Sequence, residues 1–337
     1  MIKKLKTIFV VFITIFSTVF LLELIGQNFI FKGQLYFINN VDHRLMPNEA
    51  PDINSDGIRS FSESDRFRQE DLNIIFLGDS FIFGLGLPYN KSIPYQFEEK
   101  ARKRHPNQQI NVANFGWTSS SPLLSYRLLK DIGKKYNPDI VILAIDMTDF
   151  HDDIKYLILL EKKGIYQLVD YIPISFLVLK KIMEKVAILD PVYEWAYDLP
   201  RKMFFITEKP LSETRPYFSY IQQNIEDINT FSKKELNNAK FILMILPRSY
   251  QYSDKESPNN WEKNEYEILG QYSHEPFKYF ESIKNEVDYP IHSLLPDFQN
   301  TTIFPTCFDH DPHWNEEGAR IAAEAIYKYC LEEGCFK

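Results

Sequence analysis

This sequence of 337 residues has few cysteines and little clustering of basic side chains. Its three cysteines, Cys307, Cys330 and Cys335, form no CxxC pair, which argues against a zinc or thiol-redox site. An odd count is not a disulfide framework, although one pair could bridge in an oxidising compartment. The pair Gly84 and Gly86 lacks the third glycine of a dinucleotide-binding fingerprint. We therefore expect no cofactor.

The balance of charge excludes another class of partner. The formal net charge is −8, whereas phosphate contacts need clustered lysines and arginines. The one basic run, at residues 102–105, is expected to end a surface helix. We expect no nucleic-acid partner.

A long apolar run follows lysines at positions 3, 4 and 6. Residues 7–25, TIFVVFITIFSTVFLLELI, would span roughly 28 Å as a helix, close to the hydrocarbon core of a bilayer. No Ala-x-Ala site follows, which favours an uncleaved anchor over a cleaved signal peptide. The lysines predict that residues 1–6 are cytoplasmic. The run thus predicts a single-pass cell-membrane protein, held in the membrane through residues 7–25, with its catalytic domain extracytoplasmic.

Short, nearly continuous apolar runs recur after residue 70. Residues 73–78, 110–116, 139–146 and 240–246 indicate strands, and 289–294 indicate a weaker fifth. Such runs are typical of strands buried on both faces, and helical segments separate them. The pattern predicts an α/β fold: a three-layer sandwich around a mostly parallel, flavodoxin-like sheet of about five strands, preceded by the transmembrane helix.

The remaining segments complete the expected domain organisation. Residues 26–70 are polar and turn-rich, and we interpret them as a stalk and irregular lead-in to a domain at 71–337. Residues 150–211 interrupt the strand pattern with helical spacing, which favours a helical cap over one edge of the sheet. A membrane-facing amphipathic element is the alternative for this insert.

The strand at 73–78 ends at Gly78-Asp79-Ser80. The carboxyl end of a parallel strand is where open α/β sheets place their active sites, and a following helix offers unpaired amides. Ser80 is therefore a candidate nucleophile, with helix capping as the alternative role. Asp79 is expected to brace the turn.

A serine nucleophile needs a base that a third group orients. Near the C-terminus, Asp311 and His313 stand two positions apart around Pro312, so both side chains project to the same side. The Asp311 carboxylate can then hold one imidazole nitrogen while the other takes a proton. The neighbouring Asp309 and His310 leave a metal site as a weaker alternative for this segment.

These blocks resemble the SGNH/GDSL hydrolase superfamily over about residue 73 to the C-terminal helix. Gly78-Asp79-Ser80 resembles the first block, residues 114–122 (NFGWTSSSP) the second, and the Asp311/His313 segment the last. The resemblance implies a serine hydrolase in which the amides of Ser80 and Gly116 bind the oxyanion.

The chain departs from the family in two places. The third block offers Gly-x-Asn-Asp, but residues 144–150 read AIDMTDF, so Thr148 stands where the asparagine donor would be. Losing such a donor costs on the order of 3 kcal/mol, or roughly 100-fold in rate. The last block has Asp-x-His rather than Asp-x-x-His, which resembles the branch that acetylates or deacetylates extracytoplasmic polysaccharides.

Three functions follow from these residues. The first is an extracytoplasmic serine esterase or deacetylase that cleaves O-acyl, chiefly O-acetyl, esters on a glycan or lipid. The second is an O-acyltransferase that uses the same residues and a polysaccharide hydroxyl. The third, motivated by Thr148, is a catalytically weak SGNH-like domain that binds a glycan or an assembly partner.

Overall fold

The computed structural model describes residues 2–26, 45, 47–161, 172, 174–175, 178, 200, 202–256 and 259–336. The chain divides into two compact units. One comprises residues 43–154 and 202–337, and the other comprises residues 1–42 and 155–201. The sheet and every candidate site residue belong to the first of these units.

A five-stranded parallel sheet with the order β2-β1-β3-β4-β5 forms the centre of that unit. Its strands are β1 (Leu72–Leu77), β2 (Ile110–Asn114), β3 (Ile140–Ile145), β4 (Lys240–Ile245) and β5 (Ile291–Ser293). All residues of β1, β2 and β3 are buried, as their apolar runs predict. The predicted α/β class and five-stranded parallel sheet are confirmed.

The described helices have the following bounds: α1 Ile2–Ile25, α3 Ser80–Phe83, α4 Ile93–Arg104, α5 Pro122–Ile132, α6 Asp149–Glu161, α9 Leu211–Glu235, α10 Ser249–Tyr252, α11 Glu262–Glu265, α12 Glu275–Ile283, α13 Leu295–Gln299 and α14 Glu316–Glu332. Short 3₁₀ turns lie at Ser64–Arg66, Tyr89–Lys91, Gly133–Tyr136 and Phe205–Thr207.

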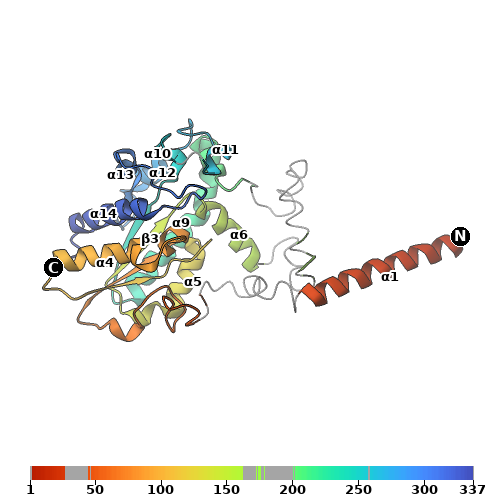
Figure 1. Cartoon of the computed structure of the whole chain (residues 1–337), viewed down its shortest axis with the longest axis horizontal. Helices are drawn as coiled ribbons and strands as arrows, with labels where there is room; N and C mark the ends of the chain where they lie inside the picture. The colour runs from red at the N-terminus through yellow and green to blue at the C-terminus, as the bar shows by residue number, and fades with distance from the viewer. Residues whose placement is uncertain are drawn as a thin grey trace. The chain divides into compact units, whose positions relative to one another are not determined.

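Two layers of helices cover the sheet. Helices α4 and α14 pack against each other, as Figure 1 shows, and α5 packs against α9. Right-handed crossovers place α4 on the face opposite to α5 and α9, because the chain moves from β1 to β2 in one direction and back to β3 in the other. The strand order reverses between β1 and β3, and the carboxyl ends of the strands at such a switch point are where open α/β sheets bind their ligands.

Part of the expected stalk is built into the domain. The side chain of Arg59 is buried and donates hydrogen bonds to the carbonyl oxygens of Phe83 (2.8 Å), Gly84 (2.9 Å) and Leu87 (2.7 Å). Its Nε also donates to Asp52 at 2.9 Å. The segment that follows residue 46 therefore supports the loop after α3.

The predicted membrane anchor at residues 7–25 is wrong. These residues form most of α1, yet no helix in the described part of the chain combines the length and apolar character that crossing a bilayer needs. Thr14, Ser17, Thr18 and Glu23 interrupt the run, so its longest unbroken apolar stretch covers only residues 8–13. The predicted single-pass cell-membrane location is wrong for the same reason.

Most of the predicted cap at 150–211 lies outside the described residues. The described part begins with α6, whose first residue, Asp149, directly follows Thr148. Residues 202–211 lead into α9, with Phe204 and Ile206 fully buried. The boundaries at 26–70 and 71–337, and the role of the insert as a cap, stay predictions.

Candidate active site

A tight turn presents Ser80 at the end of β1. Gly78 lies so close to β3 that a Cβ there would stand 2.8 Å from the carbonyl oxygen of Ala144. Asp79 caps α3, because its Oδ1 accepts a hydrogen bond of 2.9 Å from the backbone N–H of Phe81. Helix α3 is a single turn, so its dipole contributes little. The turn thus needs other groups to stabilise negative charge at Ser80.

His313 approaches Ser80 from the far end of the chain. Its Nε2 lies 2.7 Å from Ser80 Oγ, while its Nδ1 hydrogen-bonds to Asp311 Oδ1. The same Asp311 oxygen accepts the backbone N–H of His313 at 2.9 Å, which fixes the short turn between the two residues. This order of contacts, carboxylate to imidazole to hydroxyl, is that of a hydrolytic triad.

The loop that carries Asp311 and His313 is closed at its base. Cys307 and Trp314 form an antiparallel bridge, and the backbone N–H of Phe308 donates to the carbonyl oxygen of His313 at 3.0 Å. The buried Glu256 carboxylate accepts the N–H groups of Thr306 and Cys307. Asn315 then caps α14. These contacts hold the imidazole in place.

The surroundings of His313 favour its neutral form. Burial of the imidazole lowers its pKa below the usual value, and the Arg248 guanidinium acts in the same direction. The Asp311 carboxylate opposes both effects. A neutral imidazole is the form that can accept the Ser80 proton.

Two of the predicted oxyanion donors are already engaged. The backbone N–H of Gly116 donates to Asn114 Oδ1 at 2.9 Å. Thr148 donates twice to Asp146 Oδ1, through its backbone N–H at 2.6 Å and its hydroxyl at 2.5 Å. The structure thus brings Ser80, Asp311 and His313 together, but it pairs the donors of Gly116 and Thr148 within the protein.

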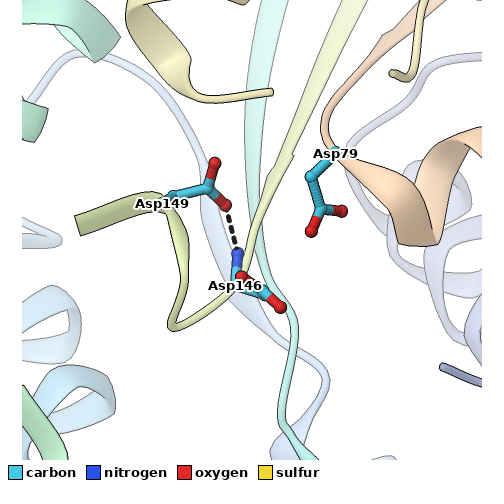
Figure 2. A group of neighbouring side chains, drawn as sticks. All are labelled: Asp79, Asp146 and Asp149. Carbon is cyan, nitrogen blue, oxygen red and sulfur yellow. Dashed lines mark hydrogen bonds between the residues drawn. The ribbon is translucent and has the colours of Figure 1, made fainter. Parts of the chain in front are cut away.

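Three carboxyl groups gather behind Ser80. Asp79, Asp146 and Asp149 are buried, and one oxygen of each lies within 4.8 Å of the others. Figure 2 shows Asp79 on the α3 side facing the other two, which join where the backbone N–H of Asp146 donates to Asp149 Oδ2 at 2.7 Å. In the part of the chain that the structure describes, this is the only such group of potential metal ligands.

An arginine that the sequence analysis did not identify neutralises part of this cluster. Arg248 follows β4, is buried, and donates to Asp146 Oδ2 at 2.5 Å and to Glu262 Oε1. Its guanidinium also lies 5.0 Å from the centre of the Phe81 ring. A protein cation already occupies one side of Asp146, so we infer no metal site here. Its only mark in the sequence is a charged residue three positions after the apolar strand β4.

The alternative metal site at residues 309–313 does not form. His310 pairs with Asp309 at 3.1 Å, and His313 is held by Asp311. Both carboxylates have separate imidazole partners, so these side chains do not converge on one point. The described geometry of this segment is that of an orienting turn beside Ser80.

Comparison with known proteins gave structural likenesses only. No protein-family model matches the chain, and no curated protein is similar to it. A two-domain esterase active on acetylated mannans is 14% identical with a TM-score of 0.43, and the alignment covers 80% of this chain and 51% of that one. This chain therefore spans about half the length of that esterase.

Two further solved structures are similar at the same level. The psychrotrophic esterase EstA from Pseudoalteromonas sp. is 13% identical, with 78% of this chain and 98% of that chain covered and a TM-score of 0.41. A GDSL-like protein from Parabacteroides merdae is 11% identical, with 79% and 97% covered and a TM-score of 0.47. Likenesses this weak carry no weight in the functional proposal, which rests on the site itself.

Proposed function

We propose that the chain is a serine ester hydrolase of the SGNH/GDSL type. The observation that carries this proposal is the continuous contact from Asp311 through His313 to Ser80, with 2.7 Å between His313 Nε2 and Ser80 Oγ. A neutral imidazole at that distance can remove the hydroxyl proton as the oxygen attacks. The order of the sequence blocks supports the same assignment.

The reaction proceeds in two halves. In the first, the proton of Ser80 passes to His313 Nε2, Ser80 Oγ bonds to the ester carbonyl carbon, and the resulting imidazolium protonates the departing alcohol. In the second, His313 removes a proton from water, which attacks the acyl-serine, and the imidazolium then returns that proton to Ser80 Oγ as the acid leaves. Asp311 holds the imidazole and stabilises its cationic form.

For the substrate class, we propose an O-acyl ester, chiefly an O-acetyl ester, on a glycan or lipid. The Asp-x-His form of the last block supports this choice. A polysaccharide hydroxyl could replace water in the second half, which would make the enzyme an O-acyltransferase. Incubating the full chain with an acetyl ester, with and without a soluble polysaccharide, separates the two: transfer yields acetylated glycan, and hydrolysis yields acetate alone.

The test of hydrolysis compares wild type with Ser80→Ala on p-nitrophenyl acetate and on an O-acetylated polysaccharide. We expect p-nitrophenol and acetate from wild type and background rates from the variant. His313→Ala is the matched variant for the base and is expected to behave like Ser80→Ala, because triad members act as a unit. Equal background rates for all three proteins on both substrates would refute the proposal.

A specific observation favours a second candidate, a weak enzyme that mainly binds acylated glycan. The N–H of Gly116 and the hydroxyl of Thr148 are both paired within the protein. Binding without turnover predicts a saturable affinity for acetylated polysaccharide that Ser80→Ala retains in full, measured by calorimetry.

A further inference from the structure

The Ser80 hydroxyl has two neighbours that can accept its single proton. His313 Nε2 lies at 2.7 Å and Asp79 Oδ2 at 3.4 Å. An ionised Asp79 would accept only, and it would draw the proton away from the base. A neutral Asp79 carboxyl carries a proton of its own and can donate toward Ser80. The charge of Asp79 therefore decides where the serine proton points.

The charges around Asp79 do not balance if every group is ionised. Asp79, Asp146 and Asp149 are almost completely buried, and the cation of the cluster, Arg248, is shared between Asp146 and Glu262. Burying unpaired negative charge is costly, so such groups hold a proton instead. Burial and the neighbouring carboxylates accordingly raise the pKa of Asp79 and of Asp149 well above the usual range.

Groups on several elements face Asp79. They are Asp146 after β3, Asp149 and Asp152 on α6, Arg248 after β4, and His313 beside Ser80. Most of these side chains are acidic, and the guanidinium is already held by two carboxylates. Their net effect favours the neutral form of Asp79.

We propose that Asp79 is a catalytic carboxylic acid whose O–H donates a hydrogen bond to the oxyanion formed at Ser80. This inference rests on the proposed function. It supplies a hydrogen-bond donor for the oxyanion, since the N–H of Gly116 and the hydroxyl of Thr148 already have partners within the protein. The oxyanion lies two bonds from Ser80 Oγ, within reach of a group that already stands 3.4 Å from that oxygen. Asp79 Oδ1 meanwhile keeps its bond from Phe81 N–H, which holds the carboxyl in place.

The proton of Asp79 stays on Asp79 throughout. When Ser80 Oγ bonds to the carbonyl carbon, the electron pair of the C=O bond moves to oxygen, and that oxygen accepts the hydrogen bond. When the tetrahedral intermediate collapses, the pair returns to the C=O bond and the leaving alcohol takes its proton from His313. Asp79 thus needs no co-reactant, and it acts only while it is neutral.

The experiment measures kcat for p-nitrophenyl acetate from about pH 4 to about pH 9 for wild type, Asp79→Asn and Asp79→Ala, with Ser80→Ala as the blank. We expect a bell-shaped profile for wild type, whose alkaline fall reports the loss of the Asp79 proton. Asp79→Asn keeps the capping oxygen and a fixed N–H donor, so its profile loses the alkaline fall. Asp79→Ala lowers kcat about 100-fold with little change in KM.

Two results would overturn the inference while leaving the hydrolase intact. One is an Asp79→Asn variant as inactive as Asp79→Ala, and the other is an alkaline fall that Asp79→Asn retains. Thermal unfolding checks that each variant is folded. If Asp79→Ala does not fold, the pH profile of Asp79→Asn alone tests the inference. A wild type no faster than Ser80→Ala would instead refute the proposed function, and this inference with it.

Discussion

Ser80 and His313 stand 233 positions apart in the sequence, and the fold brings their reacting atoms to 2.7 Å. The Ser80 side is fixed by a capped single turn, and the His313 side by a loop closed at its base. Neither side chain has to reach across solvent, because Ser80 is buried and the imidazole is largely covered. At the scale of single residues, the site is already assembled for proton transfer.

The fall of kcat/KM at low pH reports the protonation of His313. Burial and Arg248 lower its pKa, so the base stays neutral to a lower pH than a free imidazole, whose pKa is about 6.5. We therefore expect kcat/KM to fall, as pH decreases, with a midpoint below about 6.5. A midpoint clearly above that value would mean that the Asp311 carboxylate dominates the environment of the imidazole.

The sequence was sufficient to predict that Ser80, Asp311 and His313 come together, because each stands in a short motif with a chemical reason for its spacing. The donors were harder to predict. A backbone N–H such as that of Gly116 is present at every non-proline residue, and its partner depends on how Asn114 is oriented. Arg248 belongs to no motif, and only the folded chain brings it to Asp146.

At the scale of elements, Gly116 is the point where the end of β2 meets α3. A Cβ at this residue would stand 2.3 Å from the backbone nitrogen of Phe83, which cannot move without moving the turn of Ser80. We expect Gly116→Ala to lower kcat/KM about 100-fold through misplacement of the nucleophile. Gly133→Ala is the control, since the atoms nearest to its Cβ all belong to the side chain of Leu129 and none to the backbone. Full activity of Gly116→Ala would show that the turn tolerates displacement.

The lead-in segment supports the same turn through Arg59. Replacing Arg59 with alanine leaves buried carbonyl oxygens and Asp52 without their donor. We expect Arg59→Ala to lower the free energy of unfolding by about 3 kcal/mol in urea titrations. The control Arg66→Ala, at an exposed position of the same segment, should change it by less than about 0.5 kcal/mol. Equal, small effects of the two variants would show that Arg59 does not stabilise this turn.

The elements themselves were largely predictable, and their connections were not. The apolar runs gave β1 to β4 within two residues of their observed ends, because strands buried on both faces leave a clear pattern. The role of Arg59 could not be predicted, since turn-rich polar sequence looks the same in a linker and in a packed loop. Its partners in the loop after α3 are backbone carbonyl groups, which leave no mark in the sequence.

At the scale of the whole molecule, buried carboxyl groups link stability to pH. Burial raises the pKa of Asp153 from its ordinary 3.8 to about 6. The folded state therefore holds this proton more tightly than the unfolded chain does, which stabilises the fold at low pH. As pH rises from 3.8 to about 6, the free energy of unfolding loses this contribution of about 3 kcal/mol. Asp153→Asn should remove it. The readout is the slope of unfolding free energy against pH, compared between wild type and variant.

An unchanged slope in Asp153→Asn would show that this carboxyl titrates normally. The absolute stability of the variant is a separate quantity, because Asp153 also accepts hydrogen bonds from Leu123 N–H and Asn224 Nδ2. One of these donors would face the new amide group. The difference between the two slopes does not depend on this lost hydrogen bond, because its cost in unfolding free energy is the same at every pH.

The N-terminal helix is the element for which prediction from apolar composition failed. Residues 7–25 suggested a membrane span because most of them are apolar, and they do form a helix. Length and helicity are not sufficient, because no helix in the described part of the chain is long and apolar enough to cross a bilayer. The sheet, by contrast, was predictable because five separate segments pointed to the same arrangement.

Covalent labelling tests most directly whether Ser80 and His313 act as a reactive pair. The full chain is treated with a fluorophosphonate, and the intact mass and peptide masses are recorded. Wild type should gain a single phosphonyl group on Ser80, whereas Ser80→Ala should gain none and His313→Ala should react far more slowly. A wild-type chain that stays unmodified, or that is labelled equally fast without His313, would contradict the account.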